Sequence, residues 1–279
     1  MSRTSVGRIT GGALLGGIVG QPVSHSLSPV IHNAWLEAGG IDGTYAAFAP
    51  TDAAGFEALV AAGRAGLIAG VNVTAPFKEQ AFALADEAGA AARATGSANI
   101  LVFEDGRVRA DSADGAGVLS ALAEQAPQLT LKGASVVILG AGGAARASAG
   151  ALIEAGASLS ILNRTRERAE ALAADLGPAV SVAPDASVLE GADLVINALS
   201  VAPDIDLSAL KPSAVVMDMT YKPVITPLLA AARARGLTTV DGLAMLIGQA
   251  APSFEAIFRR PPPPLDLRAL LLAHLGEAA

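Results

Sequence analysis

An asparagine, a threonine and a lysine stand close together in the stretch Gly-Val-Asn-Val-Thr-Ala-Pro-Phe-Lys of residues 70–78. A strand through the first half of this stretch would place the side chains of Asn72 and Thr74 on one face at its carboxyl end. A helix opened by Pro76 would carry Lys78 in its first turn. There the ammonium faces the positive end of the helix dipole, so it is suited to donating a proton to a carbonyl oxygen. The alternative, an ordinary surface lysine, stays open at this point.

Two further groups of polar residues precede expected helices. Ser26 and Ser28 come just before Pro29, so Ser28 is expected to cap a helix whose first residue is Pro29. Two hydroxyls at a helix N-terminus can also hold a substrate carboxylate. Asp114 precedes another helix, either as its N-cap or as a carboxylate that bonds substrate hydroxyls and holds the lysine. Asn99 could add an amide to the same site.

A glycine-rich turn follows an apolar run in residues 136–145, Val-Val-Ile-Leu-Gly-Ala-Gly-Gly-Ala-Ala. The pattern fits a strand, a G-x-G-x-x-A turn and a helix, which is typical of dinucleotide binding. Gly140 permits the tight turn, Gly142 lets the backbone approach a pyrophosphate, and Ala145 lets the helix pack close to the sheet. The helix N-terminus then offers N–H groups to the phosphates.

The next expected strand ends in Asn163-Arg164-Thr165, with Arg168 one turn further on. An NAD enzyme usually carries an acidic residue here that bonds the ribose 2′-hydroxyl. Arg164 and Arg168 can instead pair with a 2′-phosphate. Together with Arg166 they oppose the helix dipole, which a merely solvated helix start does not explain. The sequence therefore predicts NADPH as the cofactor.

The composition excludes several classes of partner. The chain has 279 residues, a formal net charge of −7 and no Lys/Arg cluster, so nucleic-acid binding is not expected. It has no cysteine, which excludes disulfides and thiolate catalysis. His25 and His32 are too isolated to indicate a metal site, and we expect none.

The N-terminal region is apolar without being a membrane segment. Arg3 and Arg8 precede the apolar stretch from Ala13 to Val19, in the manner of a signal peptide, but no small-residue cleavage site follows. Polar residues and prolines in 21–33 exclude a bilayer span. We therefore expect a first buried strand in a cytoplasmic protein.

Short β-rich runs alternate with Ala- and Leu-rich helical stretches, which is typical of α/β proteins with parallel strands. In the first part we expect strands at Leu14–Val19, Tyr45–Ala49 and Leu67–Val73, helices at Pro29–Ala38, Ala53–Ala62 and Phe77–Ala94, and a hairpin of Asn99–Phe103 with Arg107–Ala110. In the second part we expect strands at Ser135–Leu139, Ser158–Leu162, Val180–Val182, Leu194–Ala198, Val215–Asp218 and Thr238–Val240. With helices between them, these six strands fit a Rossmann-type doubly wound fold.

A long apolar-periodic helix is expected from Leu243 to Phe258, ended by the prolines at 261–264 and followed by one more helix. Boundaries near Asp114 and Asp241 predict two domains. Residues 1–114 with 242–279 would form an N-terminal α/β substrate domain, and residues 115–241 a nucleotide domain. In this division the C-terminal helices return to the first domain. The hydrophobic periodicity of the sequence does not by itself indicate that return.

Several segments, taken in order, resemble the shikimate dehydrogenase family and together span nearly the whole chain. The segment from Gly20 to Pro29 resembles its carboxylate-binding segment, and Asn72–Lys78 is similar to its most distinctive motif, in which the lysine is catalytic. Asn99 and Asp114 stand where the family has a substrate-binding asparagine and the aspartate that partners the lysine.

The second half carries the other matches, to the family's two NADP segments at Gly140–Ala144 and Asn163–Arg168, to its nicotinamide segment at Asp218–Pro223, and to its closing segment at Asp241–Leu246. The resemblance places Met219 at the nicotinamide and brings Tyr221 and Gln249 to the substrate. The cofactor-binding residues implied are Gly140, Ala141, Gly142, Gly143, Ala144, Asn163, Arg164, Thr165, Arg168, Met219 and Gly242. The substrate-binding residues implied are Ser26, Ser28, Asn72, Thr74, Asn99, Asp114, Tyr221 and Gln249, with Lys78 and Asp114 catalytic.

The resemblance implies reduction of 3-dehydroshikimate to shikimate by NADPH, in the pathway to chorismate. The chain departs from the family pattern at Ser112-Ala113, where Asn-Thr is usual, at Ile100, where Thr is usual, and at Ala244, where Gly is usual. Two alternatives therefore stay open, a quinate/shikimate dehydrogenase that also uses NAD and a non-catalytic regulator that senses NADP. The retained Lys78 and Asp114 argue against the regulator. The oligomeric state also stays open, with a homodimer as one candidate.

Overall fold

The computed structural model describes residues 9–199 and 201–277. Arg3 and Arg8, which the signal-peptide comparison used, lie outside the described residues. The chain divides into two compact units, the first made of residues 1–113 with 250–279 and the second of residues 114–249.

The first unit is built on a mixed six-stranded sheet in the order β2-β1-β3-β5-β6-β4. Its strands are β1 (Leu14–Val19), β2 (Gly43–Phe48), β3 (Gly70–Val73), β4 (Glu87–Ala88), β5 (Ile100–Glu104) and β6 (Arg107–Asp111). Strands β1, β2 and β3 are parallel, so each connection must cross over through a helix, whereas β5 and β6 form the expected antiparallel hairpin.

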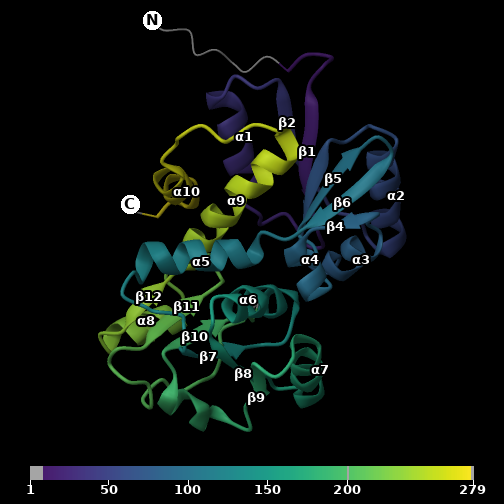
Figure 1. Ribbon diagram of the computed structural model, residues 1–279. Helices are drawn as coiled ribbons and strands as arrows, with labels where there is room; N and C mark the ends of the chain where they lie inside the picture. The colour runs from purple at the N-terminus through teal and green to yellow at the C-terminus, as the bar shows by residue number, and fades with distance from the viewer. Residues whose placement is uncertain (1–8, 200, 278–279) are drawn as a thin grey trace, which may run out of the picture. The chain divides into compact units, whose positions relative to one another are not determined.

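Helices cover both faces of this sheet (Figure 1). Helices α2 (Ala53–Arg64), α3 (Lys78–Ala83) and α4 (Ala90–Thr95) pack on one face, around the fully buried ring of Phe56. Helices α1 (Ser28–Ala38), α10 (Leu267–Leu275) and the second half of α9 (Gly242–Phe258) lie on the other. The predicted α/β layering of this part of the chain is confirmed.

The expected helix from Phe77 to Ala94 is wrong, because the chain leaves α3 to pair with the edge of the sheet. The carboxylate of Asp86 accepts a hydrogen bond from the backbone N–H of Val108 at 2.7 Å and pairs with Arg64 at 2.5 Å. Residues 87–88 then run parallel to β6 before α4 begins. Strand pairing with a distant segment outweighs the local helix propensity of this Ala-rich stretch.

The second unit holds a fully parallel sheet in the order β12-β11-β10-β7-β8-β9. Its strands are β7 (Ser135–Leu139), β8 (Ser158–Leu162), β9 (Val180–Val182), β10 (Leu194–Asn197), β11 (Val215–Asp218) and β12 (Thr238–Val240). In chain order these are strands 6-5-4-1-2-3, so the predicted doubly wound arrangement is confirmed. One face is covered by α5 (Asp114–Gln125), α6 (Gly143–Glu154) and α7 (Arg166–Leu176), and the other by η1 (Ala186–Gly191) and α8 (Pro227–Ala234).

Helix α9 runs through both units, so the second division falls at residues 249–250 rather than at 241–242. Its first half packs on α5, where a Cβ on Gly117 would lie 2.8 Å from the carbonyl oxygen of Met245. Its second half packs on α1, where the ring of Phe254 lies 5.2 Å from that of Trp35. One continuous helix therefore contributes to both cores.

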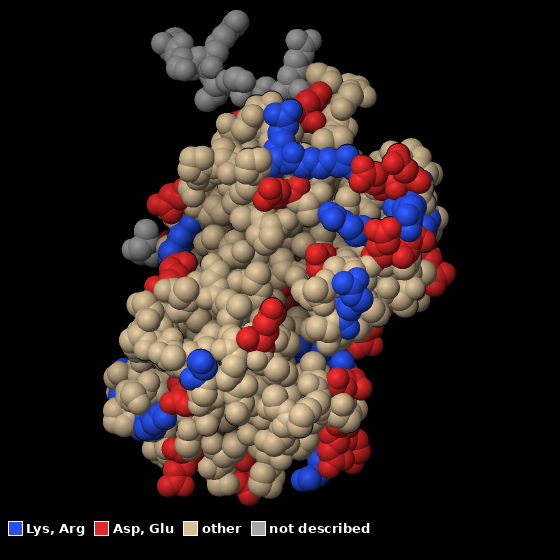
Figure 2. Space-filling view, in the orientation of Figure 1, with Lys and Arg blue, Asp and Glu red and all other residues tan. Residues whose placement is uncertain are grey.

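The apolar stretch near the N-terminus forms β1, a strand between β2 and β3. Within residues 9–199 and 201–277 no helix has the length and apolar character needed to cross a membrane. On the face drawn in Figure 2, Lys and Arg side chains alternate with Asp and Glu rather than gathering in one basic surface.

Candidate active site

The loops that follow β1 and β3 are joined at the carboxyl ends of these strands. The N–H of Thr74 donates to the carbonyl of Val19 at 2.9 Å, and the N–H of Gln21 donates to the carbonyl of Ala75 at 3.0 Å. A Cβ on Gly20 would lie only 2.2 Å from the Thr74 Cγ2 atom, so the close approach requires glycine. The segment with Ser26 and Ser28 therefore begins beside the segment that leads to Lys78.

The two serines share the start of α1, but not as expected. Ser28 is the first residue of the helix rather than its N-cap. The Ser26 hydroxyl oxygen instead accepts a hydrogen bond from the N–H of Ser28 at 3.2 Å, and Ser28 is 5% exposed. Since an accepting hydroxyl keeps its own proton, Ser26 can still donate to an anion.

Lys78 is the first residue of α3, which begins two residues later than the expected opening at Pro76. The preceding Phe77 ring stacks on Phe56 at 5.0 Å between centroids, which anchors this end of the helix. The carbonyl of Lys78 accepts a hydrogen bond from the N–H of Ala98 at 3.0 Å. This bond brings the lysine segment next to the residue before Asn99.

Asn99 directly precedes β5 and is 3% exposed. Its carbonyl accepts from the N–H of Val73 at 2.8 Å, and its side-chain oxygen accepts from the N–H of Ala113 at 2.8 Å. The first unit thus brings Thr74, Lys78 and Asn99 together at one end of the sheet.

Asn72 is buried in the same unit, with its amide engaged on both sides. Its Oδ1 accepts from the Tyr45 hydroxyl at 2.8 Å, and its Nδ2 donates to the carbonyl of Asn99 at 3.1 Å and to the Ser253 Oγ at 2.9 Å. These bonds give Asn72 a structural role in the first unit, and the substrate contact expected from the sequence stays a prediction. The local sequence pattern around Asn72 did not predict Tyr45 or Ser253 as its partners, because they lie 27 and 181 residues away from it along the chain.

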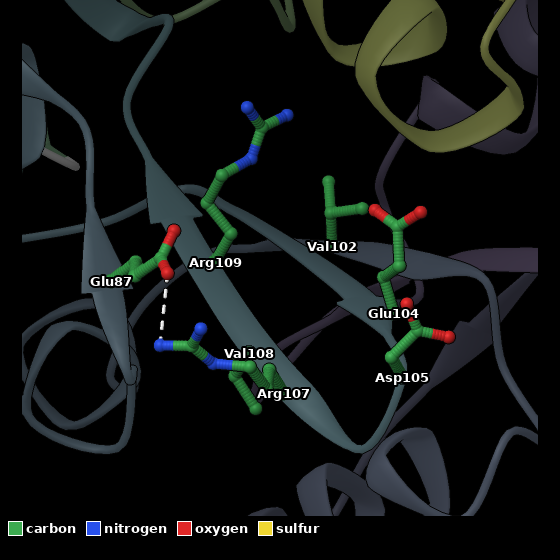
Figure 3. Close-up of a pocket in the computed structure, with 7 residues that line it drawn as sticks. All are labelled: Glu87, Val102, Glu104, Asp105, Arg107, Val108 and Arg109. Atoms are coloured by element: carbon green, nitrogen blue, oxygen red, sulfur yellow. Dashed lines mark ion pairs between the residues drawn. The ribbon is translucent and has the colours of Figure 1, made fainter.

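A cavity of about 380 Å³ in the first unit lies near the turn of the β5–β6 hairpin, away from Asn99. Figure 3 shows Arg107 paired with Glu87 at its edge, at 2.9 Å. The lining combines Glu87, Glu104 and Asp105 with Arg107 and Arg109, so neither sign of charge dominates. None of the expected site residues lines this cavity.

In the second unit the glycine-rich turn has the geometry that phosphate binding needs. Gly140 has a φ of +111°, which favours glycine, and a Cβ on Gly142 would meet open space. Gly142 caps α6 without any side-chain hydrogen bond, while Ala145 is fully buried against the sheet. The turn, with Ala141, Gly143 and Ala144, therefore leaves room beside backbone N–H groups for a pyrophosphate.

The arginines after β8 divide into one that is paired and two that are not. Arg166 pairs with Glu170 one turn along α7 at 2.7 Å. Arg164 and Arg168 are exposed and, within the described ranges of the chain, form no ion pair or side-chain hydrogen bond. Their neighbour Asn163 closes the turn by donating to the carbonyl of Thr165 at 2.7 Å. Two guanidinium groups thus stand at the strand end where a ribose 2′-phosphate would lie.

The loop after β11, which carries Met219 and Tyr221, is held by a buried carboxylate. Asp218 is 1% exposed and accepts from Asn197 Nδ2 at 3.0 Å and from the Thr226 hydroxyl at 2.7 Å. The sequence pattern did not predict this contact, although Asn197 and Asp218 end two neighbouring strands of the expected sheet. A Cβ on Gly242 would lie 2.4 Å from the Met219 carbonyl oxygen, so Gly242 and Met219 meet here.

Asp114 is the first residue of α5 and is 6% exposed. One turn further on, a Cβ on Gly117 would lie 2.9 Å from the Gln249 Cβ on α9. This close packing brings Asp114 and Gln249 to the same end of the second unit. Among residues 9–199 and 201–277, no group of three or more acidic or histidine residues is arranged to hold a metal ion.

Comparison with known proteins gives one family for both halves of the chain. Residues 18–101 match the shikimate dehydrogenase substrate-binding domain, and residues 121–241 match shikimate / quinate 5-dehydrogenase. The NADP-dependent shikimate dehydrogenase of Caulobacter vibrioides is 50% identical over 281 residues, which cover 96% of this chain and 98% of that protein.

Two solved structures share the fold over most of their length. Shikimate 5-dehydrogenase from Thermus thermophilus, in complex with NADP(H) and shikimate, is 35% identical with a TM-score of 0.81, covering 90% of this chain and 95% of that one. Quinate dehydrogenase from Corynebacterium glutamicum, in complex with NAD, is 30% identical with a TM-score of 0.85, covering 94% and 99%. The chain belongs to the shikimate dehydrogenase family.

Proposed function

We propose that this protein is an NADP-dependent shikimate dehydrogenase that interconverts 3-dehydroshikimate and shikimate. One observation carries the proposal, namely that a polar strand-end site in one unit and a dinucleotide turn in the other match the two domains of this family, in order. An oxidoreductase acting on a CH–OH group needs both a cofactor site and a proton-transfer residue, and the chain has candidates for each.

On the substrate side we assign a proton-transfer role to Lys78. Its ammonium gives a proton to the ketone oxygen during reduction, and in the reverse direction the neutral amine takes the proton from the hydroxyl. Ser26 and Ser28 hold the substrate carboxylate, supported by their place at the start of α1. Thr74 and Asn99 hold ring hydroxyls, and their backbone bonds to β1 and β3 fix their positions.

From the second unit, Asp114, Tyr221 and Gln249 complete the proposed substrate contacts. Asp114 is also a proposed catalytic residue, in the role that the family resemblance implies. Positioning dominates such a reaction, because the reacting carbons must come within about 3–3.5 Å of each other.

The cofactor side rests on residues of the second unit. The cradle of Gly140–Ala144 receives the pyrophosphate, and Arg164 and Arg168 pair with the 2′-phosphate, with Asn163 and Thr165 shaping that turn. Met219 and Gly242 line the nicotinamide position. The chemistry that NADPH supplies when bound is hydride transfer to the ketone carbon.

The test is NADP reduction with shikimate, with quinate and without an acid, followed by NADPH absorbance and repeated with NAD. Selective turnover of shikimate with NADP supports the proposal. Faster turnover of quinate, or equal use of NAD, would favour the quinate dehydrogenase alternative. That alternative is worth testing because the quinate dehydrogenase of Corynebacterium glutamicum is 30% identical to this chain. Tight NADPH binding without turnover of either acid would point to the regulator.

We further propose that the enzyme works in the cytoplasm, supported by the placement of the apolar N-terminal stretch in β1. A homodimer is the oligomeric state to test first. Light scattering on the purified protein decides it, since a monomer would have a mass near 27.7 kDa.

A further inference from the structure

A buried polar network lies beneath the residues proposed to bind substrate, and the proposed reaction does not use it. Asn72 is 6% exposed and makes three side-chain hydrogen bonds, to the Tyr45 hydroxyl, the Asn99 carbonyl and the Ser253 hydroxyl. All four residues belong to the first unit.

The Asn99 carbonyl fixes which way the Asn72 amide faces, because a carbonyl can only accept a hydrogen bond. The Asn72 Nδ2 therefore faces Asn99 and Ser253, and its Oδ1 faces the Tyr45 hydroxyl at 2.8 Å. Burial raises the pKa of the Tyr45 phenol, so the hydroxyl keeps its proton and donates it to Oδ1. A reversed amide would place its oxygen against the Asn99 carbonyl.

Tyr45 itself is clamped by α1. The Asn33 side chain accepts from the Tyr45 N–H at 3.0 Å and donates to the Tyr45 carbonyl at 2.9 Å. The His32 ring stacks on the Tyr45 ring at 4.1 Å, with an 8° angle between the planes. Backbone and ring are thus both fixed, although β2 is an edge strand of the sheet.

The network leads to the site through Asn99. The Asn99 carbonyl accepts from both the Asn72 amide and the N–H of Val73, which directly precedes Thr74. The residue before Asn99 bonds the carbonyl of Lys78. A shift of the Asn72 amide should therefore displace the end of β3 before Thr74, the segment at Asn99 before β5, and through Ala98 the start of α3 at Lys78.

We propose that Tyr45 is a positioning residue, whose hydroxyl acts through Asn72 to hold the substrate-binding strand ends in register. This inference rests on the proposed function, and it concerns shikimate alone, since the nucleotide site is built from the second unit. Loss of the hydroxyl should therefore affect the kinetic constants for shikimate and leave those for NADP unchanged.

The test compares wild type with Tyr45→Phe, Asn72→Leu and the double variant. Tyr45→Phe should lower kcat/KM for shikimate about tenfold, the scale expected from one lost buried hydrogen bond, with KM for NADP unchanged. The double variant should be no worse than Asn72→Leu, because both changes break the same path. Val60→Ala is the matched control, since it removes buried volume from α2 in the same unit, in a core cluster that contains none of the network residues. It should lower the unfolding midpoint and leave every kinetic constant unchanged.

A second measurement does not need turnover. The side-chain amide protons of Asn72 should exchange slowly with solvent in wild type and faster in Tyr45→Phe, as followed by NMR. Wild-type kcat/KM in Tyr45→Phe, equal losses for shikimate and NADP, or multiplying losses in the double variant would overturn the inference. Absence of shikimate turnover in wild type would instead count against the proposed function. In that case the amide exchange still tests the inference, because exchange that stays slow in Tyr45→Phe would count against it.

If Asn72→Leu does not fold, Ser253→Ala removes the other hydroxyl partner of Asn72. This variant should raise KM for shikimate and leave KM for NADP unchanged.

Discussion

The proposed substrate site of the first unit and the dinucleotide turn of the second unit use their polar groups in different ways. In the first unit Asn72, Asn99 and Tyr45 are buried and bonded to one another, so the proposed substrate contacts depend on a network inside the protein. At the dinucleotide turn of the second unit, Gly142 and the two arginines at 164 and 168 are exposed.

This difference follows from what each site must recognise. A dinucleotide offers phosphates, which backbone N–H groups and guanidinium groups bind without much support from neighbours. A small polyhydroxylated acid must be held by several side chains in fixed directions, and such precision requires buried support. Substitutions at the dinucleotide turn and its arginines should therefore change one cofactor constant, whereas the effects of substitutions in the first unit's buried network should spread to several substrate contacts.

The largest effect should come from Lys78. Lys78→Met keeps the length of the side chain but removes the proton, so kcat should fall about 10²–10⁴-fold, the usual contribution of a general acid. Steady-state kinetics with shikimate and NADP measure it, and Lys132→Met, at an exposed lysine of the second unit, is the control. A Lys78→Met enzyme within threefold of wild type would remove the lysine from the chemistry.

The double substitution Arg164→Ala with Arg168→Ala should come next. Removing both partners of a 2′-phosphate should raise KM for NADP about 10–100-fold, because charged hydrogen bonds are among the strong ones, and should leave KM for shikimate unchanged. Discrimination against NAD should fall by a similar factor. Arg166→Ala is the matched control, because that side chain is paired with Glu170 and its loss should leave NADP binding intact. An equal rise in KM for NADP in Arg166→Ala would refute the proposal that only Arg164 and Arg168 bind the 2′-phosphate.

The same contrast explains which features could be predicted from sequence. The G-x-G-x-x-A turn and the six strands of the second unit depend on neighbours within a few residues, and five of the six strand ranges agree with the structure residue by residue. The prediction of one helix over Phe77–Ala94 was wrong because Asp86 and β4 form hydrogen bonds with β6, a strand that lies about 20 residues further along the chain. The hydrogen bond from Tyr45 to Asn72 could not be predicted for the same reason, because the two residues are 27 positions apart and no local pattern links them. Local chemistry can be read from a sequence, whereas support from a distant segment needs the fold.

His32 offers a test of how dry the interior of the first unit is. Burial lowers the pKa of its imidazole from 6.5 to about 3, and in the described part of the chain its Nδ1 has no hydrogen-bond partner. The unfolded chain binds a proton below pH 6.5 and the folded chain does not, so stability is present above pH 6.5 and falls as pH drops toward 3. Between pH 7 and 5 the loss from this group should be about 2 kcal/mol.

His32→Phe should remove that part of the pH dependence while keeping the ring stack on Tyr45. Urea unfolding of wild type and variant at pH 7 and pH 5 measures the difference, and the solvent-exposed His25, replaced by Phe, is the control. An unchanged pH dependence in His32→Phe would mean that the aromatic cluster admits water.

The smallest effect should come from Ile100, which follows Asn99 at a position where the resemblance led us to expect Thr. The Ile100 side chain is 4% exposed and clusters with Val102, Ala113 and Ala256, so it serves packing within the first unit. Ile100→Thr should lower the free energy of unfolding by about 1 kcal/mol, from lost apolar burial and a hydroxyl placed among apolar groups. The ratio of kcat/KM for shikimate to that for quinate should stay within twofold of wild type, with Val102→Thr as the matched control. A changed ratio in Ile100→Thr alone would mean that the apolar cluster selects the substrate, and the contrast between the two units would then extend to specificity.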